Sequence, residues 1–97
     1  MTSKQRAYLK SLAQTIDTIL HIGKESMTPE IVNAVDEALT ARELIKIGVL
    51  KNCADDPKDL AQIVSERTRS NVVQVIGKKI VLYRPDPKKP KIKLPLD

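Results

Sequence analysis

Residues 72–84 read V-V-Q-V-I-G-K-K-I-V-L-Y-R, two runs rich in β-branched residues around the turn G-K-K at 77–79. Such runs on either side of a glycine-containing turn are typical of a β-hairpin. The pattern predicts antiparallel strands over 72–76 and 80–84. Because the chain before this hairpin alternates helix with strand, parallel crossovers precede an antiparallel pair, and we expect a mixed sheet.

Two of the three predicted helices begin at clear start signals. Thr28-Pro29 and Asp56-Pro57 each place an N-cap residue before a proline suited to the first helical turn. Apolar side chains then recur at a spacing of three and four residues, which puts them on one face. The N-terminal helix is predicted over 4–16 from the same spacing, with Ser3 as its N-cap.

Two further strands are predicted between the helices. Residues 19–22 form a short apolar run closed by Gly23 and are expected to be a buried strand. Residues 44–50 place three β-branched side chains on one face and Lys46 on the other. The element order is therefore αβαβαββ. This order predicts an α/β fold, a two-layer sandwich with helices packed on a four-stranded mixed sheet.

The chain is predicted to be a single domain with a short tail. Its 97 residues have room for one hydrophobic core, and 41% hydrophobic content is enough to form that core without disulfides. Residues 1–84 are assigned to the domain. The composition changes at 85–97, which hold four of the six prolines and four lysines. Proline-rich sequence forms neither helix nor central strand, so this segment is predicted to be an extended basic tail.

The sequence shows no catalytic or metal-binding constellation. His21 is the only histidine and Cys53 the only cysteine, and no nucleophile–base set, paired-carboxylate motif or C-x-x-C pair occurs. An enzyme is therefore not expected, nor a metal or other cofactor. Cys53 is interpreted as an ordinary, partly exposed thiol. The lone cysteine, with neither a signal peptide nor a membrane span in the pattern, favours the cytoplasm and no membrane partner.

The charge distribution favours a polyanionic partner. Seventeen basic and twelve acidic residues give a net charge of +5. The predicted helix at 29–43 carries one basic and four acidic residues, so the positive charge lies on both sides of it. Tyr8 and Tyr83 are the only aromatic residues, which excludes the base-stacking platform of an RNA-recognition motif.

A candidate anion site lies at 23–30, which read G-K-E-S-M-T-P-E. A glycine-started loop that leads into a helix N-terminus presents free backbone N–H groups and the positive end of the helix dipole. Lys24 adds a full positive charge at the tip of the loop. The small residues Gly23 and Ser26 would let a phosphodiester backbone come close.

Four stretches of the chain carry a family resemblance: Y-L-K-S-L-A at 8–13, H-I-G-K at 21–24, A-L-T-A-R-E-L-I-K-I at 38–47, and the hairpin sequence at 72–84. They closely resemble the CRM domain, named for chloroplast RNA splicing and ribosome maturation, in its stand-alone bacterial, YhbY-like form. The resemblance covers about residues 4–84 in the same order and spacing.

The resemblance implies an RNA-binding module whose fold is similar to the C-terminal domain of translation initiation factor three. Bacterial members associate with precursors of the large ribosomal subunit, and plant relatives act in group II intron splicing. The family's G-x-x-G loop, which resembles the backbone-clamping loop of KH domains, falls on 23–26.

The loop departs from the family pattern at two positions. The second glycine is Ser26, and Glu25 adds a negative charge. If position 26 has a positive φ, serine is strained there, and the carboxylate of Glu25 would repel a phosphate. The Ser26 hydroxyl could instead donate a hydrogen bond to a phosphate.

The sequence thus predicts electrostatic, shape-led binding of structured ribosomal RNA by a monomer, during assembly of the large subunit. Lys24 and the loop N–H groups would hold backbone phosphates, and other basic residues would extend the positive surface. The predicted RNA-binding residues are Gly23, Lys24, Glu25, Ser26, Met27, Arg67, Arg69, Lys78, Lys79 and Arg84, with Arg6, Lys10 and His21 as weaker additions.

Two other hypotheses remain open. A protein-interaction module could dock on a ribosomal protein through the acidic helix at 29–43 or the tail at 85–97. Its association would survive high salt, whereas phosphate binding weakens steeply with salt. A small RNA-processing enzyme would need an acid, base or metal cluster that the sequence does not show.

Overall fold

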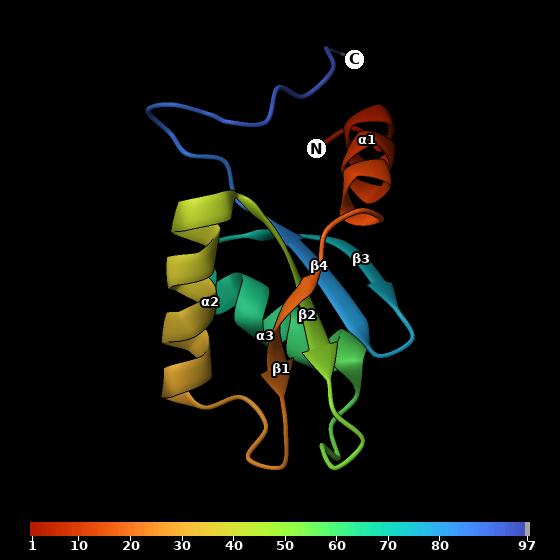
Figure 1. Cartoon of the computed structure of the whole chain (residues 1–97), viewed down its shortest axis with the longest axis vertical. Coiled ribbons are helices and arrows are strands. Elements are labelled where there is room, and N and C mark those ends of the chain that lie inside the picture. The colour runs from red at the N-terminus through yellow and green to blue at the C-terminus, as the bar shows by residue number, and fades with distance from the viewer. Residues whose placement is uncertain (97) are drawn as a thin grey trace.

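The structure, a computed structural model, describes residues 1–96. The helices and strands follow the predicted order αβαβαββ (Figure 1). They are α1 (Ser3–Ala13), β1 (Thr18–Ile22), α2 (Pro29–Arg42), β2 (Leu44–Val49), α3 (Pro57–Thr68), β3 (Asn71–Ile76) and β4 (Lys79–Tyr83). None of the helices in the described part of the chain is long and apolar enough to span a bilayer.

β2 and β4 form the centre of the sheet, and the strand order is β1-β2-β4-β3. β1 is parallel to β2, whereas β4 is antiparallel to both β2 and β3. The predicted mixed sheet is confirmed. The prediction that residues 19–22 are a buried strand was wrong, because β1 is at the edge: of its five residues only Ile22 is buried, and His21 is exposed.

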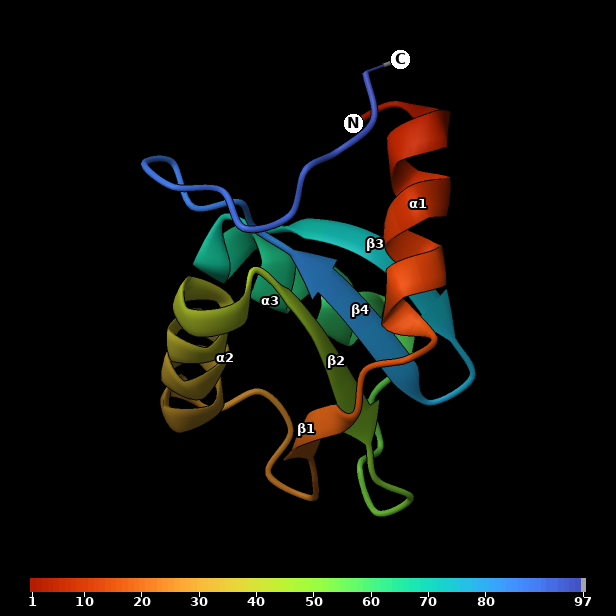
Figure 2. The same ribbon diagram turned by 45° about the horizontal axis from the view of Figure 1, so that its top comes forward.

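Helices cover both faces of the sheet (Figure 2). α2 and α3 pack on one face, and α1 packs on the other together with the C-terminal segment. The α2–α3 core consists of Ile22, Val35, Leu39, Ile45, Ile47, Val49, Cys53, Leu60, Ala61, Val64, Ile80 and Leu82. The α1-side core consists of Leu9, Ala13, Leu44, Val73, Val81 and Tyr83. The sheet and the α2–α3 pair are the two expected layers, and α1 partly covers the second face.

The predicted helix starts of α2 and α3 are confirmed. Thr28 Oγ1 accepts a hydrogen bond from Ile31 N at 3.1 Å, and Asp56 Oδ1 accepts one from Lys58 N at 2.8 Å. These bonds satisfy N–H groups that lack an intrahelical partner.

The ends of α1 differ from the prediction. Its N-cap is Thr2 rather than Ser3, because Thr2 forms a reciprocal capping box with Gln5. The helix ends at Ala13 rather than at residue 16, since the N–H groups of residues 14–16 bond to carbonyls only three residues back. Ile16 still packs against the α1-side core.

The C-terminal segment folds back along the domain and is held by Glu43. This residue is fully buried at the end of α2, with a φ of 67°. Its carboxylate accepts hydrogen bonds from the backbone N–H groups of Asp86, Lys91 and Ile92 at 2.7, 2.9 and 2.8 Å. Burial acts to raise the pKa of Glu43, but these three bonds outweigh it and the pKa lies below its ordinary value.

Apolar contacts and further hydrogen bonds, including one from Lys91 Nζ to Ala41 O, hold the rest of this segment. Ile92 and Leu94 pack against the α1-side core, and Gln5 Nε2 donates to Pro95 O at 3.1 Å. Residues 85–96 contain no helix or strand, in keeping with their proline content. The last residue of the predicted tail, Asp97, lies outside the described residues.

Candidate nucleic-acid interface

Three connections meet at one end of the strands, which we call the loop edge. They are residues 23–28, 50–56 and 77–78. The parallel strands β1 and β2 end together, with Ile22 opposite Val49. The β3–β4 turn reaches the same edge, because Val49 N donates to Lys78 O at 2.8 Å. The loops after β1 and β2 lie at the bottom of Figure 1, and the β3–β4 turn lies above them on the right, beside the end of β2.

The loop after β1 is a tight turn. Ser26 N donates to Gly23 O at 2.9 Å, and Ser26 has a φ of 59°. This left-handed conformation at position 26 is costly for a residue other than glycine. The Ser26 hydroxyl donates a hydrogen bond to the Asp55 carboxylate, so the loop after β1 is tied to the loop after β2. The hydroxyl that could have served a phosphate is thus engaged within the protein.

Gly23, in contrast, is not required by the fold. Its φ lies outside the left-handed region, and a Cβ added there would meet Leu50 Cδ1 at 3.5 Å and Asn52 Oδ1 at 3.7 Å, which are ordinary contacts. The left-handed position of the loop is therefore occupied by serine. The glycine stands where a side chain would fit, and it leaves the backbone beside Lys24 uncovered.

Several predicted residues gather at the loop edge. Lys24, Glu25 and Lys78 are exposed. Met27 is partly buried and packs against the α2–α3 core, which anchors the loop. His21 lies on the exposed face of β1, two residues before the loop. The predicted site residues that the structure brings together here are His21, Gly23, Lys24, Glu25, Ser26, Met27, Lys78 and Lys79.

Arg67 and Arg69 lie at the other end of the strands, away from the loop edge. α3 ends there, and the following strand begins with Asn71 paired to Tyr83. Both arginines are exposed, and Arg69 caps α3 with a φ of 56°. Both are therefore separate from the loop edge.

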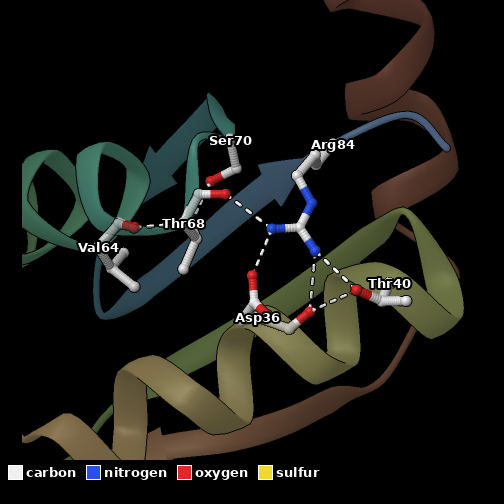
Figure 3. Close-up of polar contacts among 6 residues, drawn as sticks. All are labelled: Asp36, Thr40, Val64, Thr68, Ser70 and Arg84. Atoms are coloured by element: carbon white, nitrogen blue, oxygen red, sulfur yellow. Dashed lines mark hydrogen bonds and ion pairs between the residues drawn. The ribbon is translucent and has the colours of Figure 1, made fainter. Parts of the chain in front are cut away.

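The two remaining predicted arginines are engaged inside the protein. Arg84 Nη1 donates to Asp36 Oδ1 at 2.6 Å and to Thr68 O at 2.7 Å (Figure 3). Its Nη2 donates to Asp36 O and to Thr40 Oγ1 at 2.9 and 2.8 Å. Arg6 Nη1 donates to the carbonyls of Val72 and Val73. Arg84 thus joins β4 to α2 and α3, and Arg6 joins α1 to β3.

The CRS1 / YhbY (CRM) domain profile matches residues 1–84. The chain belongs to the CRM domain family. Two relatives of this CRM domain are the "Probable RNA-binding protein YqeI" of Bacillus subtilis and an "RNA-binding protein" of Haemophilus influenzae. The first is 40% identical over 95 residues, 98% of this chain and 99% of the relative. The second is 30% identical over 95 residues, 98% and 95% of the two chains.

A solved structure also matches this CRM domain. The solution structure of the hypothetical protein SAV1595 from Staphylococcus aureus has a TM-score of 0.82 and 48% sequence identity, over 98% of this chain and 99% of that chain. The α/β fold expected from the sequence is therefore shared with an experimental structure of similar length.

The side chains of Cys53 and Tyr83 are both packed inside the CRM domain. Cys53 is 4% exposed and belongs to the α2–α3 core, so the expectation of a partly exposed thiol was wrong. Tyr83 is 3% exposed, as expected for a packed rather than base-stacking residue. Burial raises the pKa of Tyr83, and the nearby charge of Glu43 raises it further.

Sequence reasoning missed Asp55, the partner of Ser26. The contact joins residues 29 positions apart, and nothing in the local pattern signals it. Within residues 1–96, no group of three or more His, Cys, Asp and Glu side chains is placed to hold a metal ion. The loop edge remains the site at which exposed positive charge, a backbone turn and a helix N-terminus meet.

Proposed function

We propose that this CRM domain binds structured ribosomal RNA through the loop edge, as a monomer, and associates with precursors of the large ribosomal subunit in the cytoplasm. The observation that carries the proposal is the turn at 23–26, with exposed Lys24 at its tip, at the start of α2. Free N–H groups and lysines hold phosphates. The names of the relatives as RNA-binding proteins support the choice of ligand.

The proposed RNA-binding unit is residues 1–84. Within it, Arg84 and Arg6 stabilise the fold, since their guanidinium groups already bond to other parts of the chain. Arg67 and Arg69, away from the loop edge, contribute long-range attraction. Residues 85–96 pack along the domain through Ile92 and Leu94, and their lysines are solvent-exposed charges outside the proposed RNA-binding surface.

Lys24→Ala is expected to weaken RNA binding with little effect on folding. An exposed loop lysine contributes little to stability, whereas loss of one phosphate contact lowers affinity roughly three- to tenfold and reduces the slope of log K against log salt by about 0.7 to 0.9. The measurement is fluorescence anisotropy with a fragment of large-subunit ribosomal RNA and a length-matched control RNA, at several salt concentrations.

The matched control is Lys4→Ala, which removes the same charge from the first turn of α1. It should bind as the wild type does. Equal affinity of Lys24→Ala and the wild type would place the RNA site elsewhere. Association of the wild type with ribosomal particles that persists unchanged from about 50 to about 200 mM salt would favour protein docking. Docking through the C-terminal segment has less support, because Ile92 and Leu94 pack on their own domain.

Glu25→Gln is expected to act in the opposite direction. Glu25 is exposed beside Lys24, and its carboxylate repels an incoming phosphate. Removing that charge should raise RNA affinity about two- to fivefold at low salt, with a gain that shrinks as salt screens the repulsion. Glu37→Gln, which removes an exposed carboxylate from α2, serves as the control. An equal gain in both variants would show that net charge alone is responsible, and would exclude a phosphate near Glu25.

A further inference from the structure

α1 leaves part of its face of the sheet uncovered. It stops short of the loop edge (Figure 2), and a groove of about 230 Å³ lies between its C-terminal end and strands β2, β3 and β4. Ala13 and Val81 are both buried in the α1-side core, and both also line this groove. We call it the lysine groove. The polar and exposed side chains that line it are Lys10, Gln14, Lys46, Gln74, Ile76 and Lys79.

The strand register explains why these side chains meet. Lys46 on β2 and Gln74 on β3 are both paired with Val81 on the central strand β4, so all three side chains point to the α1 face. Ile76 is paired with Lys79 and shares that face. Lys10, in the last turn of α1, completes the groove.

The groove has positive charge that the described chain does not neutralise. Its lining includes three lysines and no carboxylate. Within residues 1–96 the one ion pair is Arg84 with Asp36, so none of the three ammonium groups is ion-paired. Lys79 Nζ donates to Thr18 Oγ1 at 3.1 Å, which holds it without cancelling its charge. Like charges that share a groove repel each other, and a bound anion relieves that repulsion.

Gly48 leaves room for the Lys79 side chain between the lysine groove and β1. A Cβ at this position would lie 2.9 Å from His21 Cδ2 and 3.3 Å from Lys79 Nζ. Because glycine leaves this space free, Lys79 reaches across β2 to β1 and lies near His21. His21 is two residues before Gly23, where the loop begins. Lys79, Gly48 and His21 therefore lie between the lysine groove and the proposed RNA-binding loop.

We propose that the lysine groove holds a second segment of the RNA backbone, continuous with the segment at the loop. Lys10, Lys46 and Lys79 bind phosphate oxygens, whereas the amides of Gln14 and Gln74 bind ribose hydroxyls or base edges. An open groove lined by lysines from three elements suits an extended polyanion better than a small phosphate. This inference rests on the proposed function and extends its footprint across the sheet.

The test compares two double variants of equal charge. Lys10→Gln with Lys46→Gln alters the groove, and Lys4→Gln with Lys89→Gln removes two exposed lysines elsewhere. Anisotropy with the large-subunit RNA fragment should show roughly tenfold weaker binding for the groove variant and a salt slope smaller by about 1.4, the value for two single-strand phosphates. The control variant should change affinity by less than about twofold.

Folding does not confound this comparison. In residues 1–96 neither Lys10 nor Lys46 makes a side-chain hydrogen bond or ion pair, so both double variants should melt at the wild-type temperature. The charge-preserving pair Lys10→Arg with Lys46→Arg should retain most of the affinity, since arginine also binds phosphate.

Three results would overturn the inference, and they differ in whether the proposed function still stands. If Lys24→Ala weakens binding but the groove variant binds like the wild type, the inference is wrong and the proposed function stands. If groove and control variants lose the same affinity, net charge explains the loss. If the wild type shows no salt-dependent RNA binding, the proposed function is wrong and the groove inference falls with it.

Discussion

Glu43→Gln should lower the free energy of unfolding by about 2–4 kcal/mol, because a buried acceptor of three hydrogen bonds is replaced by a group that must also donate. Oε1 accepts from Lys91 N and Ile92 N, and Oε2 accepts from Asp86 N. The glutamine amide can satisfy one side only and turns its NH₂ toward an N–H on the other. Urea denaturation gives the loss in stability, and hydrogen exchange at residues 85–96 shows whether the segment detaches.

The acid dependence of stability provides the check on this prediction. The pKa of Glu43 in the folded protein lies below its ordinary value of 4.5, so the unfolded chain binds the proton more readily. The stabilisation is complete above that ordinary value and is lost as pH falls through the lower folded pKa. Glu43→Gln should flatten this acid loss. Part of it will remain, because backbone N–H bonds from Lys88 and Lys89 also lower the pKa of Asp86. A variant with the wild-type acid profile would contradict the role given to Glu43.

Arg84→Ala should cost about 2–3 kcal/mol of stability, since charge-assisted hydrogen bonds to several acceptors are lost together. The Arg84 side chain is 22% exposed, and one of its acceptors, the carbonyl of the buried Thr68, keeps no other side-chain donor among residues 1–96. Figure 3 shows the guanidinium between the end of α3 and the side of α2. Arg84→Lys should recover little of the loss, because an ammonium cannot reproduce a planar fork that contacts two helices.

Arg69→Ala is the matched control for this prediction. Arg69 is exposed, and its side chain makes no hydrogen bond or ion pair within residues 1–96. Its left-handed backbone is equally unfavourable for alanine, so the stability change should stay within about 0.5 kcal/mol. Thermal denaturation separates the two variants. If the Arg84→Ala protein is as stable as Arg69→Ala, the contacts of Arg84 contribute little to folding stability. Arg84 would then again be a candidate RNA-binding residue.

The architecture of the domain could be predicted because its signals are local. Thr28-Pro29 and Asp56-Pro57 mark the first residues of α2 and α3. The capping hydrogen bonds of Thr28 and Asp56 reach backbone N–H groups only three and two residues further along the chain. The hairpin at 72–84 is equally local. The end of α1 was placed three residues too late, because apolar spacing continues through residue 16 while the backbone hydrogen bonds tighten. The edge position of β1 depends on strand order, which local spacing does not encode.

The candidate site was only partly predictable, because many of its contacts join residues far apart in the sequence. The loop at 23–26 is visible in the sequence, and so is the departure at Ser26. Net charge cannot show which arginines are free, because Arg6 and Arg84 find their acceptors 66 and 48 residues away. The side chain of Lys46 was predicted to point away from the apolar face of its strand. The groove that it lines forms only when β2, β3, β4 and α1 pack together, which the local sequence does not show.

The contact between Gln5 and Pro95 has a consequence for how this domain can be tethered. It brings the beginning of α1 and the C-terminal segment together at the end of the molecule opposite the loop edge (Figures 1 and 2). A partner attached through either terminus therefore leaves from one end of the domain, and the loop edge lies at the other end. The domain can be joined head to tail with others, or anchored to a surface through either terminus, without obstructing that edge.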